Sequence, residues 1–129
     1  MSVIEDDYVT QAERVISGLP RKYRSDDFEL TTTQLRVLLS LTAQLLGEAQ
    51  LSTEPTLSDS LRDKVQYLRV RFIYQSGRDK AVKDFVHKAK LLDALEEIGD
   101  SRKNLLRFCR YMEALVAYKK YLDPKEATR

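Results

Sequence analysis

Apolar residues recur at intervals of three and four along residues 31–50, which is the spacing of one face of an α-helix. Thr31, followed by Gln34 three positions later, forms the pattern of a capping box that opens a helix. The predicted buried face contains Leu35, Leu38, Leu39, Thr42, Leu45, Leu46 and Ala49. We therefore expect this helix to pack against other helices.

Four further segments show the same periodicity and predict helices at 7–17, 58–76, 79–98 and 102–121. Their main apolar positions are Val9, Ala12, Val15 and Ile16; Leu61, Val65, Leu68 and Phe72; Ala81, Val82, Phe85, Ala89, Leu92 and Leu95; and Leu105, Phe108, Met112, Leu115 and Val116. The predicted helix ends are Gly18 with Pro20, Gly77 in a left-handed conformation, Gly99, and Asp123 with Pro124. Asp100 or Ser101 is expected to cap the last helix.

The segments between these helices are polar and lack periodicity, so 19–30 is interpreted as a linker anchored by Phe28 and Leu30, and 51–57 as a loop. No strand pattern competes over a comparable length. The expected fold is therefore an all-α, single-domain bundle of about five helices. Within it, residues 1–30 form the first helix and linker, 31–121 the helical core, and 122–129 a flexible tail.

Composition narrows the possible chemistry. The chain has 129 residues, enough for one domain, with a single cysteine (Cys109) and a single histidine (His87). Cys109 on an apolar helix face is typical of inert packing, and one histidine leaves little from which to build a catalytic triad or metal site. We therefore expect no enzyme activity, no catalytic residue, no metal and no cofactor.

Isolated acidic residues do not change that expectation. The adjacent pairs Asp6 with Asp7 and Asp26 with Asp27 could hold a divalent ion, but adjacent carboxylates are common in loops and caps. Glu113 lacks a second carboxylate for acid and base catalysis and is expected to pair with an arginine from another helix.

The start of the chain and its apolar runs predict the cellular location. Acidic residues near the N-terminus do not fit a signal peptide, and the apolar runs are far shorter than the roughly 18 residues of a membrane span. We expect a soluble, cytoplasmic protein that does not enter membranes.

The net charge of +2 hides an uneven distribution. Residues 1–30 contain 4 basic and 7 acidic residues, residues 31–60 contain 1 and 3, and residues 61–129 contain 17 and 10. Such asymmetry within one chain suggests an acidic partner such as nucleic acid.

Helical spacing strengthens that interpretation in segment 58–76 and just beyond it. Lys64, Tyr67, Arg71, Tyr74 and Arg78 fall at intervals of three and four and would form one stripe of alternating cations and aromatic rings. Cations offer contacts to phosphates, and tyrosines stack on bases. The alternative is that the tyrosines pack on a neighbouring helix while the cations extend to water.

Other cations are less distinctive. Those at helical spacing in 102–121 are Lys103, Arg107 and Arg110, and those in 79–98 are Lys80, Lys83, His87, Lys88 and Lys90, where a solvated face is favoured. Arg36 is the only cation in residues 31–60 and has no acidic neighbour one turn away, so it is expected to form a buried pair or an intermolecular contact.

Three stretches together resemble a known family: 30–36 (LTTTQLR), 67–78 (YLRVRFIYQSGR) and 108–118 (FCRYMEALVAY). In order and spacing they are similar to the small subunit of the type III-A CRISPR–Cas interference complex. The resemblance spans nearly the whole chain, with 1–29 and 51–57 contributing little.

That resemblance implies a non-catalytic helical subunit of a guide-RNA complex. It would associate with other subunits, stack with copies of itself into a short filament, and line the path of target RNA paired to the guide. Because pairing reads the sequence, the subunit needs only contacts that tolerate any target.

Carried over position by position, the resemblance marks eight candidate RNA-binding residues: Arg36, Arg69, Arg71, Arg78 and Arg110, with Lys64, Lys83 and Arg107 as further candidates. Arg69 and Arg71 lie two residues apart and cannot share one narrow stripe, so one of them is expected to face a protein neighbour. Two alternatives remain open: a helical adaptor without RNA contact, and, less favoured, a small hydrolase.

Overall fold

The computed structural model describes residues 2–123 and shows six helices with no strand in that part of the chain. They are α1 (Tyr8–Ser17), α2 (Thr32–Leu51), α3 (Asp59–Arg78), α4 (Lys80–Lys88), α5 (Leu91–Ile98) and α6 (Arg102–Leu122). The expected all-α fold is confirmed. None of these helices combines the length and apolar character needed to span a membrane.

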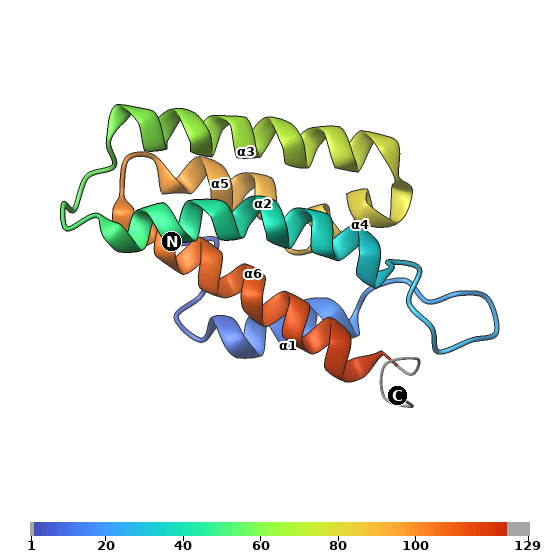
Figure 1. Cartoon of the computed structure of the whole chain (residues 1–129). Helices are drawn as coiled ribbons and strands as arrows, with labels where there is room; N and C mark the ends of the chain where they lie inside the picture. The colour runs from blue at the N-terminus through green and yellow to red at the C-terminus, as the bar shows by residue number, and fades with distance from the viewer. Residues whose placement is uncertain (1, 124–129) are drawn as a thin grey trace.

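Three long helices dominate the bundle. In Figure 1, α2 lies between α3 and α6, while α1 packs along α6, and α4 and α5 lie behind this layer against α3. Most of the predicted apolar positions are buried in the centre, where Phe72 and Phe108 have ring centroids 6.1 Å apart. Val9 is an exception, because it is 46% exposed. The exposed sides of α2, α3 and α6 are thus available for partners.

Polar caps fix where the helices begin. The capping box of α2 is confirmed: the Thr31 hydroxyl accepts from the backbone N–H of Gln34, and the Gln34 amide oxygen accepts from the backbone N–H of Thr31. Ser101, one of the two expected caps, accepts from the N–H of Asn104 at the start of α6. The linker anchors Phe28 and Leu30 are both buried, as expected.

The single helix expected at 79–98 is wrong, because the chain breaks between α4 and α5 at Lys90, which has a left-handed backbone (φ 57°, ψ 41°). Val82, Phe85, Val86 and Ala89 are buried before the break, and Leu91, Ala94, Leu95 and Ile98 after it. Positions nine residues apart differ by about 180° around a helix, so an unbroken helix would direct these two sets to opposite sides. The break turns both sets toward the core.

The expected left-handed cap at Gly77 is also wrong. Helix α3 continues through Gly77 to Arg78, and Asp79 then ends α3 and caps α4 by accepting from the N–H of Ala81. The side-chain amide of Gln34 also donates a hydrogen bond to the Asp79 carboxylate, which connects the start of α2 to this junction. Gly99 does adopt a positive φ of 53° and ends α5 as predicted.

Residues 122 and 123, which were predicted to belong to a flexible tail, are part of the folded chain. Leu122 belongs to α6, and Asp123 is buried in an ion pair with Lys119, which is itself only 2% exposed. Burial of a charged pair requires the two groups to stay together, so residues 122 and 123 are part of the folded bundle. Residues 124–129 lie outside the described part of the chain.

Candidate nucleic-acid interface

The cation and tyrosine stripe lies on one continuous helix, because α3 extends past its predicted end at Gly77 and includes Arg78. Tyr67 and Tyr74 on α3 are 60% and 54% exposed, so neither packs into the core against a neighbouring helix. The Arg71 and Arg78 guanidinium carbons lie 5.7 and 6.0 Å from the centre of the Tyr74 ring. These cation–π contacts hold both arginines beside an exposed aromatic face.

A groove runs between this stripe and α2. It encloses about 260 Å³ and is lined by Leu41, Gln44, Leu45 and Glu48 from α2 and by Lys64, Tyr67, Leu68 and Arg71 from α3. Lys64 forms an ion pair with Glu48 across it. The sequence pattern on α3 predicted one wall of this groove, but nothing in the sequence showed that α2 supplies the other.

Arg69 and Arg71 face different surroundings within the chain. Arg69 lies 3.7 Å from the carboxylate of Glu96 on α5 and so turns toward a helix of the same chain. Arg71 is half-buried in the groove on the α2 side.

Arg107 is occupied within the fold. Its guanidinium donates to the carbonyl oxygens of Ile4 and Glu5, each at 3.0 Å, and lies 3.6 Å from the Asp6 carboxylate. These contacts join α6 to the segment preceding α1, across more than 100 residues of sequence. They give Arg107 a structural role that its spacing with Lys103 did not reveal.

Arg110 is exposed on α6 and pairs with Glu113 at 3.3 Å, one turn away on the same helix. The expectation that Glu113 pairs with an arginine from another helix is therefore wrong. Both side chains point outward, and an i, i+3 neighbour is the nearest opposite charge for an exposed residue. Such a solvent-exposed pair opens at little cost when a partner binds.

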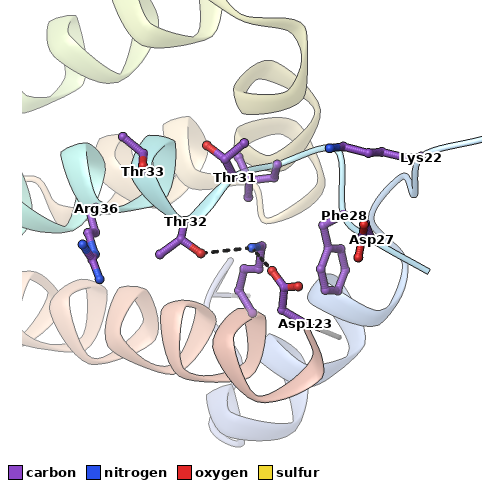
Figure 2. A pocket seen from close by; sticks show the side chains of 10 residues that line it. Lys22, Asp27, Phe28, Thr31, Thr32, Thr33, Arg36 and Asp123 are labelled. Atoms are coloured by element: carbon purple, nitrogen blue, oxygen red, sulfur yellow. Dashed lines mark hydrogen bonds and ion pairs between the residues drawn. The ribbon is translucent and has the colours of Figure 1, made fainter. Parts of the chain in front are cut away.

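Arg36 is exposed near the start of α2, so the predicted buried ion pair is wrong, and the intermolecular contact stays a prediction. It borders a pocket of about 240 Å³ between the linker, α2 and the end of α6 (Figure 2). In the floor of that pocket the buried Lys119 ammonium pairs with Asp123, donates to the Thr32 hydroxyl and lies 5.4 Å from the Phe28 ring centre.

Lys83 lies elsewhere, exposed on α4 in a shallow depression shared with Gly18 and Lys88. The structure therefore does not unite all eight candidates in one site. It gathers Lys64 and Arg71 in the groove with Arg78 further along the same helix, and leaves Arg36, Arg110 and Lys83 on other elements.

The single cysteine and the single histidine of the chain lie in different surroundings. Cys109 is buried, and this burial, with a smaller contribution from the Glu113 carboxylate, raises the pKa of its thiol to about 12. His87 is exposed on α4. Within residues 2–123 no three His, Cys, Asp or Glu side chains cluster in a way that could hold a metal ion.

One feature of α3 was not predicted as functional. Val70 and Ile73 are 55% and 50% exposed beside the cation stripe, so this helix carries apolar residues on its outer side as well as toward the core. Their three-residue spacing from Tyr67 was visible in the sequence. Valine and isoleucine favour strands by propensity, so residue type alone does not indicate an exposed position on a helix.

Comparison with known proteins connects the chain to a family. Residues 9–125 match the family model described as Csm2 Type III-A. In two strains of Mycobacterium tuberculosis, the CRISPR system Cms protein Csm2 is 75% identical to this chain over 126 residues, which is 98% of this chain and 99% of the relative. The protein of the same name from Streptococcus thermophilus is 48% identical over 127 residues, covering 98% of this chain and 100% of the relative.

Proposed function

The chain belongs to the Csm2 family of type III-A CRISPR systems, and on that basis we propose that it is a non-catalytic small subunit of an RNA-guided effector complex. In this role it binds target RNA paired to the guide without reading its sequence. It works in the cytoplasm with other subunits of the complex and stacks with copies of itself into a short filament.

The observation that carries the RNA-binding role is the exposed stripe on α3. Arg71 and Arg78 flank the Tyr74 ring, and Lys64 continues the row at the groove. Cations in a row along a helix suit a chain of phosphates, and such contacts are the same for every sequence. We assign Arg71 and Arg78 the main contacts, with Lys64, Arg36, Arg110 and Lys83 as secondary ones.

Two of the candidate residues are less suited to RNA because they have partners within the fold. Arg69 faces Glu96, and Arg107 holds the N-terminal segment. We therefore give both a structural role in the free protein.

Salt dependence tests RNA binding directly. With the purified chain and a labelled single-stranded RNA, the logarithm of the binding constant should fall with the logarithm of salt concentration at a slope of about −3 for four phosphate contacts. A slope near zero would contradict binding through phosphates.

Substitution of the stripe gives the matching residue test. Arg71→Ala with Arg78→Ala should weaken binding to unrelated RNA sequences by a similar factor while the helical circular dichroism spectrum stays unchanged, because Arg78 is exposed and the half-buried Arg71 does not belong to the buried core. Arg62→Ala is the control, since Arg62 is an exposed arginine of α3 on the side opposite Arg71. Equal losses from both variants would argue against a defined stripe.

The exposed Val70 and Ile73 favour a second candidate function, a helical adaptor in which α3 contacts only protein. Tyrosine and arginine are enriched at protein interfaces as well as on RNA-binding surfaces. RNA crosslinking inside the purified complex separates the two. Adducts on α3 or α6 support RNA contact, whereas a pure adaptor yields none on either helix.

A further inference from the structure

The groove between α2 and α3 contains a donor without a partner. Arg71 Nε is buried and makes no hydrogen bond within residues 2–123. It is the only such side-chain atom among the residues that line the groove. Because buried N–H groups are almost always paired in folded proteins, an unpaired one on a side chain that lines the groove marks a place where a shift of Arg71 would meet an acceptor from a ligand.

The walls of the groove are unsuited to a phosphate. Leu41, Leu45 and Leu68 provide apolar surface, and the negative charge of Glu48 stands beside Lys64 in an ion pair. A phosphate placed here would lose water against leucine side chains and gain little net attraction. A flat, uncharged group with polar edges fits this lining better.

Tyr67 supplies an aromatic face at the same groove. Its side chain lines the groove and is 60% exposed, so a planar ring can reach it without displacing a core residue. Nucleobases have the required form, since each has apolar π-faces for stacking and acceptor atoms on its edge.

We propose that the groove between α2 and α3 binds one unpaired nucleobase of RNA, stacked on Tyr67 and accepting a hydrogen bond from Arg71 Nε. The inference rests on the proposed RNA-binding function and adds a base site to its phosphate contacts. The guanidinium has five N–H donors, so its terminal nitrogens stay available to the RNA backbone. Every base offers an edge acceptor, which keeps this site tolerant of sequence.

The test compares two oligonucleotides that have the same sugar–phosphate backbone and differ only in the presence of bases. The purified full-length chain is titrated with a labelled single-stranded oligouridine and with an abasic oligonucleotide of equal length. The base-containing RNA should bind about tenfold more tightly, in line with the stacking of one base on an aromatic side chain. Equal affinity for the two, with a steep salt dependence, would overturn the base site and leave phosphate binding intact.

Substitutions then locate the effect. Tyr67→Ala should remove most of the preference for the base-containing RNA, Tyr67→Phe should keep it, and Tyr121→Ala, at an exposed tyrosine on α6, should leave it unchanged. Arg71→Lys retains the charge but lacks the Nε donor, so it should lower the preference without changing the salt slope.

The remaining outcomes are also decisive. A base preference that survives both Tyr67→Ala and Arg71→Lys would place the base elsewhere and overturn this inference. If Tyr67→Ala impairs self-association but neither RNA is affected, the groove belongs to a protein neighbour. Failure of the chain to bind either RNA overturns the base site together with the RNA-binding function.

Discussion

Arg107 shows how one residue in a basic row can serve the fold instead of a ligand. Its three contacts with Ile4, Glu5 and Asp6 attach the N-terminal segment to α6. Hydrogen bonds to charged groups contribute more than those between neutral ones, typically about 1.5–3 kcal/mol. Solvent reduces this here because the side chain is partly exposed.

Arg107→Ala should therefore lower the free energy of unfolding by about 1–2 kcal/mol, measured by urea denaturation, and speed hydrogen exchange in residues 3–6. RNA affinity should change little. The control is Lys103→Ala, one turn earlier on α6 and exposed, which should affect neither. Loss of RNA affinity at unchanged stability would instead assign Arg107 to the RNA.

Two buried side chains predict how stability depends on alkaline pH. Burial raises the pKa of the Cys109 thiol from 9.0 to about 12 and that of the Tyr111 hydroxyl, which donates to the carbonyl of Ala89, from 10.0 to about 12. Above their ordinary pKa values the unfolded chain releases these protons while the folded chain retains them. Stability from each group is thus complete below its unfolded pKa and is lost as pH rises toward 12.

The free energy of unfolding should fall between pH 9 and 10.5, with Cys109 contributing about 1.4 kcal/mol per pH unit. In Cys109→Ala this slope should be smaller by that amount, whatever the variant's stability at neutral pH. The measurement is urea denaturation at a series of pH values. Parallel curves for the two proteins would show that the thiol titrates normally in the fold.

At the scale of elements, the junction between α4 and α5 depends on one strained residue. A left-handed backbone costs a side-chain-bearing residue roughly 1–2 kcal/mol, and glycine avoids this cost while losing more freedom on folding. Lys90 is exposed, so its side chain contributes little to offset the strain.

Lys90→Gly should therefore raise the melting temperature or leave it unchanged, whereas Lys90→Ile should lower the free energy of unfolding by about 1–2 kcal/mol. Lys83→Gly is the matched control, because Lys83 is exposed within α4 and glycine there should cost about 1 kcal/mol. A loss from Lys90→Gly equal to that from Lys83→Gly would contradict a left-handed conformation at this position.

This junction also shows where prediction from sequence stopped. The starts of α2 and α6 were predictable because caps such as Thr31 and Ser101 act through local chemistry. The break at Lys90 was missed because neither glycine nor proline marks it. The sequence does contain a sign of the break: Val82 and Leu91 are both apolar and buried, yet they would lie on opposite sides of one continuous helix. The prediction of a single helix did not take this into account.

The candidate site also contains features that could be predicted from the sequence and features that could not. The stripe from Lys64 to Tyr74 follows from helical spacing within one element and was predictable, whereas Arg78 joins it because α3 continues past Gly77. The groove was not, because it requires α2 to lie beside α3, and the occupation of Arg107 requires a contact across the full length of the chain. Contacts between distant parts of the chain determine which cations remain available to a ligand. Residue spacing within one helix does not specify those contacts.

For the whole molecule, the unusual property is that α3 is apolar on two sides. Leu61, Val65, Leu68 and Phe72 are buried, while Val70 and Ile73 lie exposed on the outer side. Isolated surface hydrophobics are common, but two neighbouring ones beside exposed Tyr67 and Tyr74 form a continuous surface of the kind found at interfaces. Within the proposed function, Val70 and Ile73 are the natural place for contact between copies of the chain, while Tyr67 and Tyr74 beside them face the RNA.

Val70→Glu with Ile73→Glu should therefore abolish self-association, measured by sedimentation velocity at increasing protein concentration. Carboxylates at the contact would lose hydration without gaining a partner, and the two facing copies would repel each other. Since both positions are about half-exposed, the helical spectrum should persist. The control is Leu51→Glu, because Leu51 is 87% exposed at the C-terminal end of α2. Unchanged association in the double variant, with loss in the control, would move the contact from α3 to the α2–α3 loop.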